Sequence, residues 1–142
     1  MNYLLDTNIV VFLMKAHEPL VTRLRDVSPS ALAVSSITLA EMWYGAARSA
    51  RPTRSRSEQD AALAPFRVLD FDANAADIYA SVRARLADAG TPIGDRDLMI
   101  ASIAIANRMA VITNNVSEFS RVPGLVVRDW TQAGPKDDGD EA

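Results

Sequence analysis

Short apolar runs along this chain alternate with longer stretches in which apolar residues recur at helical spacing. The runs predict strands over residues 2–6, 32–35, 67–71, 110–113 and 125–127. The helical spacing predicts helices over residues 9–14, 38–48, 58–66, 74–89 and 97–107, with a further short helix around residues 21–25. Alternating strands and helices predict an α/β domain with a mainly parallel central sheet covered by helices on both faces.

Three acidic residues stand where such elements meet. Asp6 ends the first strand, Glu41 follows the second strand early in the next helix, and Asp97 opens an apolar helix. Parallel strands bring their carboxyl ends to one edge of the sheet, so we expect these acids to converge there. Close, buried carboxylates repel one another, and a cation relieves the cost. Oxygen ligands without His or Cys favour Mg²⁺ or Mn²⁺, which activates water for phosphodiester hydrolysis.

Each acid also fits a purely structural role. Asp6 fits an N-cap of the first helix, and Asp97 fits a first-turn acid that the helix dipole favours. Glu41 fits a capping box with Thr38. If these roles are the whole explanation, the chain is an inactive α/β binding module with well-capped helices.

Composition narrows the class of protein. The chain of 142 residues is long enough for one domain, and 49% of its residues are hydrophobic. The absence of cysteine excludes zinc ribbons, thiolate nucleophiles and disulfide frameworks. We see no signal peptide and no run of transmembrane length, and we expect a soluble, cytoplasmic protein.

Charge is concentrated in two places. We expect residues 132–142 to form an acidic, disordered tail, in which residues 136–142 hold four of the 18 acids and one of the 15 basic residues, so the rest is neutral. The other is a basic segment over residues 48–57, predicted as a loop. This segment contains four arginines: Arg48, Arg51, Arg54 and Arg56. They are candidates for contacts to RNA phosphates, although a solvated loop explains them nearly as well.

The motifs at these positions resemble those of PIN-domain ribonucleases, and specifically the VapC toxins of bacterial type II toxin–antitoxin pairs. They are Leu5-Asp6-Thr7-Asn8, Ser36 to Glu41 with Tyr44-Gly45, Ile93-Gly94 with Asp97 to Ala101, Val111 to Asn115 with Glu118-Phe119, and Val122 to Leu125. Each motif is weak alone, but their order and spacing over residues 1–131 are specific.

The resemblance implies a compact α/β/α sandwich and a Mg²⁺- or Mn²⁺-dependent endoribonuclease. It implies that Asp6, Glu41 and Asp97 bind the metal and position water. Asn115 stands at a fourth position that is often aspartate in the family, so a second metal is in doubt; Asp95 either supplies the missing charge or merely caps the helix. Thr7 and Thr113 would be supporting hydroxyls.

The resemblance also implies partners. These are an RNA substrate, structured and cut at a single-stranded loop, with transfer RNA the leading candidate; a VapB-like antitoxin that acts in trans; and a second copy of the chain in a homodimer. Trp43 and Tyr44 would serve a groove or the dimer surface, or simply the core.

Two other phosphate-handling classes fit less well. A haloacid-dehalogenase-type phosphatase needs a second aspartate two residues after the first, where this chain has Asn8. A receiver domain needs a lysine at a strand end, and Lys15 and Lys136 are both misplaced for that role. Only the inactive binding module remains as a rival to the nuclease.

Overall fold

The structure, a computed structural model, describes residues 1–133. The predicted acidic tail over residues 132–142 therefore lies almost entirely outside the described residues. The elements, in chain order, are β1 (Tyr3–Leu5), α1 (Thr7–Met14), α2 (Glu18–Arg25), a 3₁₀ turn (Pro29–Ala31), β2 (Leu32–Ser35), α3 (Ser36–Ala47), α4 (Pro52–Leu63), β3 (Arg67–Leu69), α5 (Ala73–Asp88), α6 (Asp95–Ala106), β4 (Ala110–Ile112), α7 (Val116–Phe119) and β5 (Val127–Arg128).

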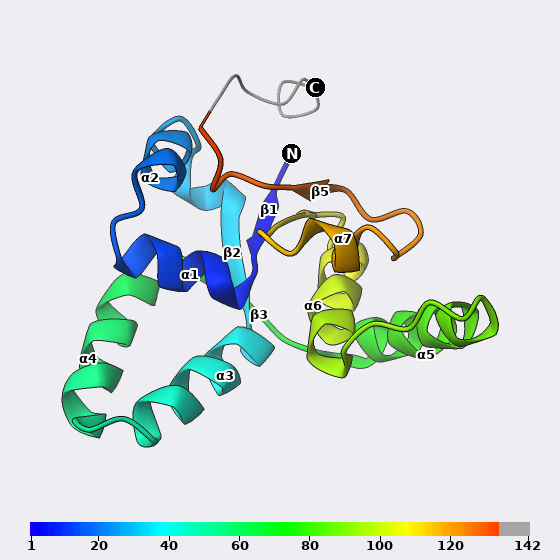
Figure 1. Cartoon of the computed structure of the whole chain (residues 1–142), viewed down its shortest axis with the longest axis horizontal. Coiled ribbons are helices and arrows are strands. Elements are labelled where there is room, and N and C mark those ends of the chain that lie inside the picture. Colours follow the sequence, from blue (N-terminus) through cyan, green and yellow to red (C-terminus); the bar gives the residue numbers. More distant parts are fainter. Residues whose placement is uncertain (134–142) are drawn as a thin grey trace.

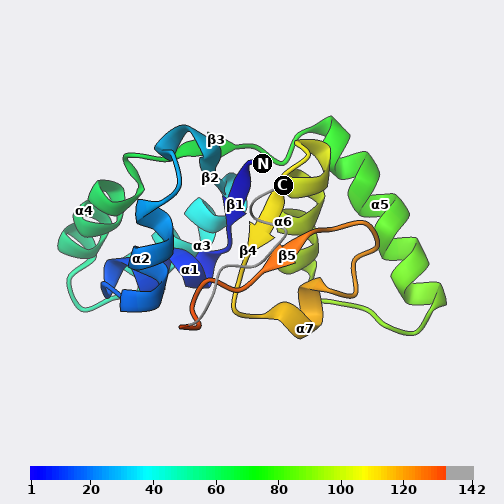
Figure 2. The same cartoon turned by 90° about the horizontal axis from the view of Figure 1, so that it is seen from above.

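The five strands form one sheet in the order β3-β2-β1-β4-β5, and every neighbouring pair is parallel. Helices α1 to α4 lie on one side of this sheet, and α5 to α7 lie on the other (Figures 1 and 2). The predicted three-layer α/β/α sandwich is confirmed. Because β1 is the central strand, its carboxyl end opens onto the middle of the sheet edge.

Side chains alternate across the sheet and fill a core on each face. Tyr3 and Leu5 belong to the core beneath α1 to α3, whereas Leu4 between them belongs to the core beneath α5 and α6. Both faces are apolar because helices cover both, as expected for a parallel sheet. Helix α6 is buried on most of its surface, as its apolar sequence predicts.

The predicted basic loop is wrong over most of its length. Helix α4 begins at Pro52, six residues before the predicted start, and ends at Leu63. Proline is well suited to the first helical position, and two exposed ion pairs at i,i+4 spacing support the helix: Arg54 with Glu58 at 3.0 Å, and Arg56 with Asp60 at 3.1 Å. Two of the four arginines are thus engaged along their own helix.

Residues 130–131, near the end of the described chain, contact residues of the amino-terminal half. Trp130 is buried, and its ring lies 4.7 Å from the ring of Tyr3, centroid to centroid. His17 Nε2 lies 2.8 Å from the carbonyl oxygen of Thr131. Within residues 1–133, no helix is long and apolar enough to span a bilayer.

Candidate active site

Asp6 leaves β1 at the carboxyl edge of the sheet and is only 4% exposed. Its two carboxylate oxygens accept different donors: the backbone N–H of Thr7 at 2.8 Å and the hydroxyl of Thr113 at 2.9 Å. Burial raises the pKa of Asp6, although both hydrogen bonds act in the opposite direction. Asp6 therefore caps α1, as predicted, and also presents a fixed carboxylate at the sheet edge.

Glu41 reaches the same edge through a chain of hydroxyl groups. Ser35 Oγ donates to Thr38 Oγ1 at 3.3 Å, Thr38 Oγ1 lies 2.9 Å from Thr7 Oγ1, and Thr7 Oγ1 donates to Glu41 Oε1 at 2.7 Å. The helix cap is Ser35, whose Oγ accepts from the N–H of Thr38. The capping box that would pair Thr38 with Glu41 is therefore wrong, because Glu41 is held by a residue of another helix.

Asp97 lies in the first turn of α6, half-buried and facing the other acids. Burial, together with repulsion from Asp6 and Glu118, raises the pKa of Asp97 to about 7. A hydrogen bond between Asp97 and Glu118 acts in the same direction on Asp97. The structure thus brings Asp6, Glu41 and Asp97 within electrostatic range of one another, as the sequence predicts.

Glu118 is a fourth acid at this edge, and it is not among the metal ligands predicted from the sequence. It lies on α7, and its Oε1 accepts the backbone N–H of Gly94 at 2.7 Å, at the start of α6. The Gly94 N–H and the amide of Asn115 lower the pKa of Glu118. Helix α7 is too short to show periodicity, but the family motif that contains Glu118-Phe119 marks the position.

Asn115 and Asp95, the two residues considered for the fourth position, make different contacts. Asn115 Nδ2 donates to Glu118 Oε2 at 2.8 Å, so the amide orients the carboxylate. Asp95 accepts from the hydroxyl of Tyr79 at 3.2 Å and lies 3.6 Å from Arg83, and its side chain is 62% exposed. Glu118, rather than Asp95, adds the fourth charge to what we call the acid cluster: Asp6, Glu41, Asp97 and Glu118.

The acid cluster has the chemistry of a site for a hard cation. All its donors are carboxylate oxygens, and the raised pKa values of Asp6 and Asp97 show that together they resist ionisation without a cation. As the side chains stand, no three acidic or imidazole groups of residues 1–133 surround one ion position. Binding an ion would therefore draw the carboxylates closer together.

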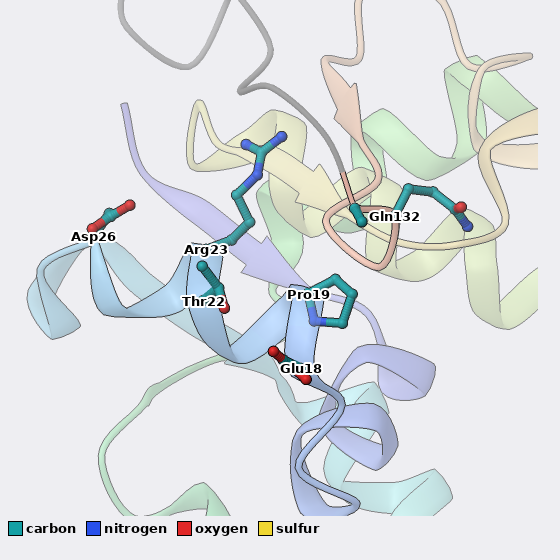
Figure 3. A pocket seen from close by; sticks show the side chains of 7 residues that line it. Glu18, Pro19, Thr22, Arg23, Asp26 and Gln132 are labelled. Atoms are coloured by element: carbon teal, nitrogen blue, oxygen red, sulfur yellow. The ribbon is translucent and has the colours of Figure 1, made fainter.

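A cavity elsewhere on the molecule is not part of this site. It has a volume of about 450 Å³ and lies between α2 and the last described residues (Figure 3). Its lining mixes charged and small side chains: Glu18, Pro19, Thr22, Arg23, Asp26, Gln132 and Ala133. None of them belongs to the acid cluster.

A parallel α/β/α sandwich with acids gathered at the carboxyl edge of its strands is typical of one family of domains. Comparison of the sequence with known protein families identifies that family. The family model for the PIN domain matches residues 3–125, and the chain belongs to this family. The resemblance inferred from the sequence motifs is confirmed.

Within the family, the chain is similar to VapC proteins. It is 38% identical to the tRNA(fMet)-specific endonuclease VapC of Salmonella typhimurium over 130 residues, which are 92% of this chain and 98% of that protein. It is 37% identical to ribonuclease VapC2 of Rickettsia felis, again over 92% of this chain and 98% of that protein.

Solved structures of VapBC proteins are also similar to this chain. VapBC2 from Rickettsia felis, bound to a DNA fragment from its promoter, matches with a TM-score of 0.85 and 36% identity over 92% of this chain and 99% of that one. VapBC-1 from nontypeable Haemophilus influenzae also has a TM-score of 0.85, with 34% identity over 93% of this chain and all of that chain.

Proposed function

We propose that this chain is an endoribonuclease of the VapC type that depends on Mg²⁺ or Mn²⁺ and is neutralised by a VapB-like antitoxin. The observation that carries the proposal is the acid cluster, in which the buried carboxyl group of Asp6 and the half-buried one of Asp97 both have raised pKa values. Its place at the carboxyl edge of a parallel sheet is where such folds bind ligands.

Asp6, Asp97 and Glu118 are the residues that we propose hold the ion, with Glu41 beside them. When bound, a divalent cation lowers the pKa of a water and offsets charge that develops on a phosphodiester. The protein's own part is positioning. Thr113 and the Thr7 N–H fix both oxygens of Asp6, and Thr7 fixes Glu41 through its hydroxyl. Asn115 and Gly94 hold Glu118 in the same way.

Glu41 and the protonated form of Asp97 are suited to different tasks. With a pKa of about 7, Asp97 exchanges a proton near neutral pH and gives it up once a cation is present. Glu41 is 26% exposed and lies at the mouth of the cluster, so it is placed to accept a proton from an attacking water. These roles for Asp6, Glu41, Asp97, Glu118 and Asn115 are proposals to be tested residue by residue.

The substrate and partners follow from the relatives. The Salmonella relative is named a tRNA(fMet)-specific endonuclease, and we propose structured RNA, with transfer RNA first among candidates, as the substrate here. The solved VapBC structures are toxin–antitoxin complexes, which supports inhibition in trans by a VapB-like protein. A homodimer of this chain stays a prediction, as does the domain boundary at residue 131.

The deciding experiment measures cleavage of purified tRNA and of total cellular RNA with Mg²⁺, with Mn²⁺ and with EDTA. We expect cleavage only with the metal, and we expect Asp97→Asn and Glu118→Gln each to abolish it while circular dichroism shows a folded protein. Asp88→Asn, at the exposed end of α5, makes the same charge change outside the cluster and should cleave normally.

If the chain is an inactive binding module, we expect the opposite results. If the acids were only helix caps, metal would not bind by calorimetry, and the two cluster variants would behave like Asp88→Asn. Failure of every RNA to be cut, together with no heat of metal binding, would reject the nuclease.

A further inference from the structure

The surface beside the acid cluster carries an exposed aromatic ring. Tyr44 follows Glu41 by three residues on α3, so both side chains lie on the same face of the helix. Tyr44 is 67% exposed, and within residues 1–133 its ring makes no aromatic contact and its hydroxyl no hydrogen bond. Its neighbour Trp43 differs, since it is half-buried with the guanidinium of Arg56 at 3.8 Å from the ring centroid.

The guanidinium of Arg96 lies beside the Glu41 carboxylate. Arg96 Nε lies 3.6 Å from Glu41 Oε2, and the Arg96 side chain is 71% exposed. This distance is that of a loose ion pair, which contributes little to stability in water. Arginine is also poorly placed in the first turn of α6, where the helix dipole favours acids. The position of Arg96 therefore has no evident structural benefit.

Other arginines near the site are committed to the protein itself. Arg83 donates to the hydroxyl of Tyr79 at 2.8 Å and pairs with Asp95. Arg121 donates to the carbonyl oxygen of Pro92 at 2.9 Å. Arg96, which contacts a cluster acid directly, has a guanidinium that can leave its carboxylate for another anion at small cost. A polyanion that approaches four carboxylates needs such a counter-charge.

We infer that Tyr44 and Arg96 grip single-stranded RNA beside Glu41, with Tyr44 stacked on a base and Arg96 bound to a backbone phosphate. The inference rests on the proposed nuclease function and adds the residues that hold the strand at the cut. Aromatic side chains beside cations are the usual means of holding single strands without reading their sequence.

The composition of the surface favours RNA over a protein partner. Centres of protein interfaces are depleted of charged residues. Here the aromatic ring has charged or small neighbours along α3: the half-buried Glu41 and the exposed Arg48 on its own helix face, and the exposed Gly45 and Ala47 next to it. Arg96 joins this surface through its contact with Glu41. A lone ring in such surroundings buries too little apolar area to anchor a protein, but it is sufficient to stack one base.

The test measures binding of a fluorescein-labelled single-stranded RNA oligonucleotide by anisotropy at several KCl concentrations. Every variant carries Asp97→Asn, so that the probe is not cut. We expect Tyr44→Ala to weaken binding by about 5- to 100-fold with an unchanged salt dependence, and Tyr44→Phe to bind normally. We expect Arg96→Gln to lower the slope of log K against log salt by about 0.7, and Arg96→Lys to retain it.

The control is Arg67→Gln, which removes an exposed arginine at the start of β3, the opposite end of the strands. Photo-crosslinking of a 5-iodouridine probe should label Tyr44 and vanish in Tyr44→Ala. Affinities and slopes equal to those of Arg67→Gln would overturn the inference. So would a change of oligomeric mass in Tyr44→Ala with RNA binding intact, which would assign the ring to a protein interface.

Metal-dependent cleavage by the unmutated chain, measured in parallel, distinguishes the proposed nuclease function from the proposed RNA contacts of Tyr44 and Arg96. Cleavage with unaltered binding by the variants overturns this inference and leaves the proposed function standing. No cleavage and no binding by any form overturns both.

Discussion

Two neighbouring carboxyl groups in the acid cluster respond in opposite directions to their surroundings. The pKa of Asp97 is raised to about 7, chiefly by burial, whereas that of Glu118 is lowered, chiefly by the Gly94 N–H. The hydrogen bond between them also raises the pKa of Asp97 and lowers that of Glu118, because protonated Asp97 donates the bond and the Glu118 carboxylate accepts it. Without a cation, the pair therefore holds one proton near neutral pH.

This proton makes the stability of the metal-free protein depend on pH. Between about pH 4 and pH 7, folded Asp97 retains a proton that the unfolded chain has lost, so stability falls as pH rises through this window. We expect Asp97→Asn to raise the free energy of unfolding in EDTA at pH 8 by on the order of 1–2 kcal/mol, a value reduced by solvent screening of a half-buried group. At pH 4 the variant should match the unmutated chain.

Urea unfolding at the two pH values provides the measurement. Asp6, whose pKa is also raised, contributes in the same direction, so the variant should flatten the pH dependence without removing it. Asp88→Asn should leave the curve unchanged. Equal pH dependence in Asp97→Asn and the unmutated chain would contradict the assignment of the proton to Asp97.

At the scale of elements, the sequence was informative where a strand or a long helix fixed the position of a residue. Asp6 and Glu41 follow the neighbouring parallel strands β1 and β2, whereas Asp97 begins the long helix α6, which leads into β4. Glu118 was missed because α7 has four residues and its position depends on contacts with Gly94 and Asn115, which no spacing in the sequence encodes.

The first half of helix α4, residues 52–57, was missed for a different reason. Its serines and arginines resemble a loop in composition, and the helix buries only Leu63. The clues were Pro52 at its start and the i,i+4 order of Arg54 with Glu58 and Arg56 with Asp60. Exposed pairs of this kind contribute only about 0.3–0.5 kcal/mol each, so α4 depends mainly on its packing against α3 and α1.

Hydrogen exchange should reveal this difference between helices. We expect amides of α4 to exchange at least about ten-fold faster than those of α6, because α6 buries six residues and α4 buries one. Gln59→Ala, which removes the 2.9 Å hydrogen bond from Gln59 Nε2 to the Met42 carbonyl, should accelerate exchange in α4 further. Protection of α4 equal to that of α6 would show that the helix has stronger support than its contacts indicate.

At the scale of the whole molecule, two cores on opposite faces of one sheet must form together. The core beneath α1 to α3 is closed by Trp130, which arrives last in the chain and packs on Tyr3 near its start. We expect Trp130→Ala to lower the free energy of unfolding by about 3–5 kcal/mol, because it removes a ring that is 1% exposed.

Thermal and urea unfolding would measure the loss, with Tyr44→Ala as the control for removing an exposed aromatic ring. Tyr44→Ala should change the free energy of unfolding by less than about 0.5 kcal/mol. A loss of similar size in both variants would mean that Trp130 does not close the core.

The position of β1 in the centre of the sheet has a consequence for synthesis of the protein. Asp6 is synthesised more than a hundred residues before β4, the strand that pairs with β1, and before Glu118 on α7. A nascent chain therefore gains Glu41 and Asp97 in turn, but the cluster stays incomplete until Glu118 on α7 has been made. If the chain cuts RNA as proposed, cleavage cannot begin before β4 and α7 have been synthesised.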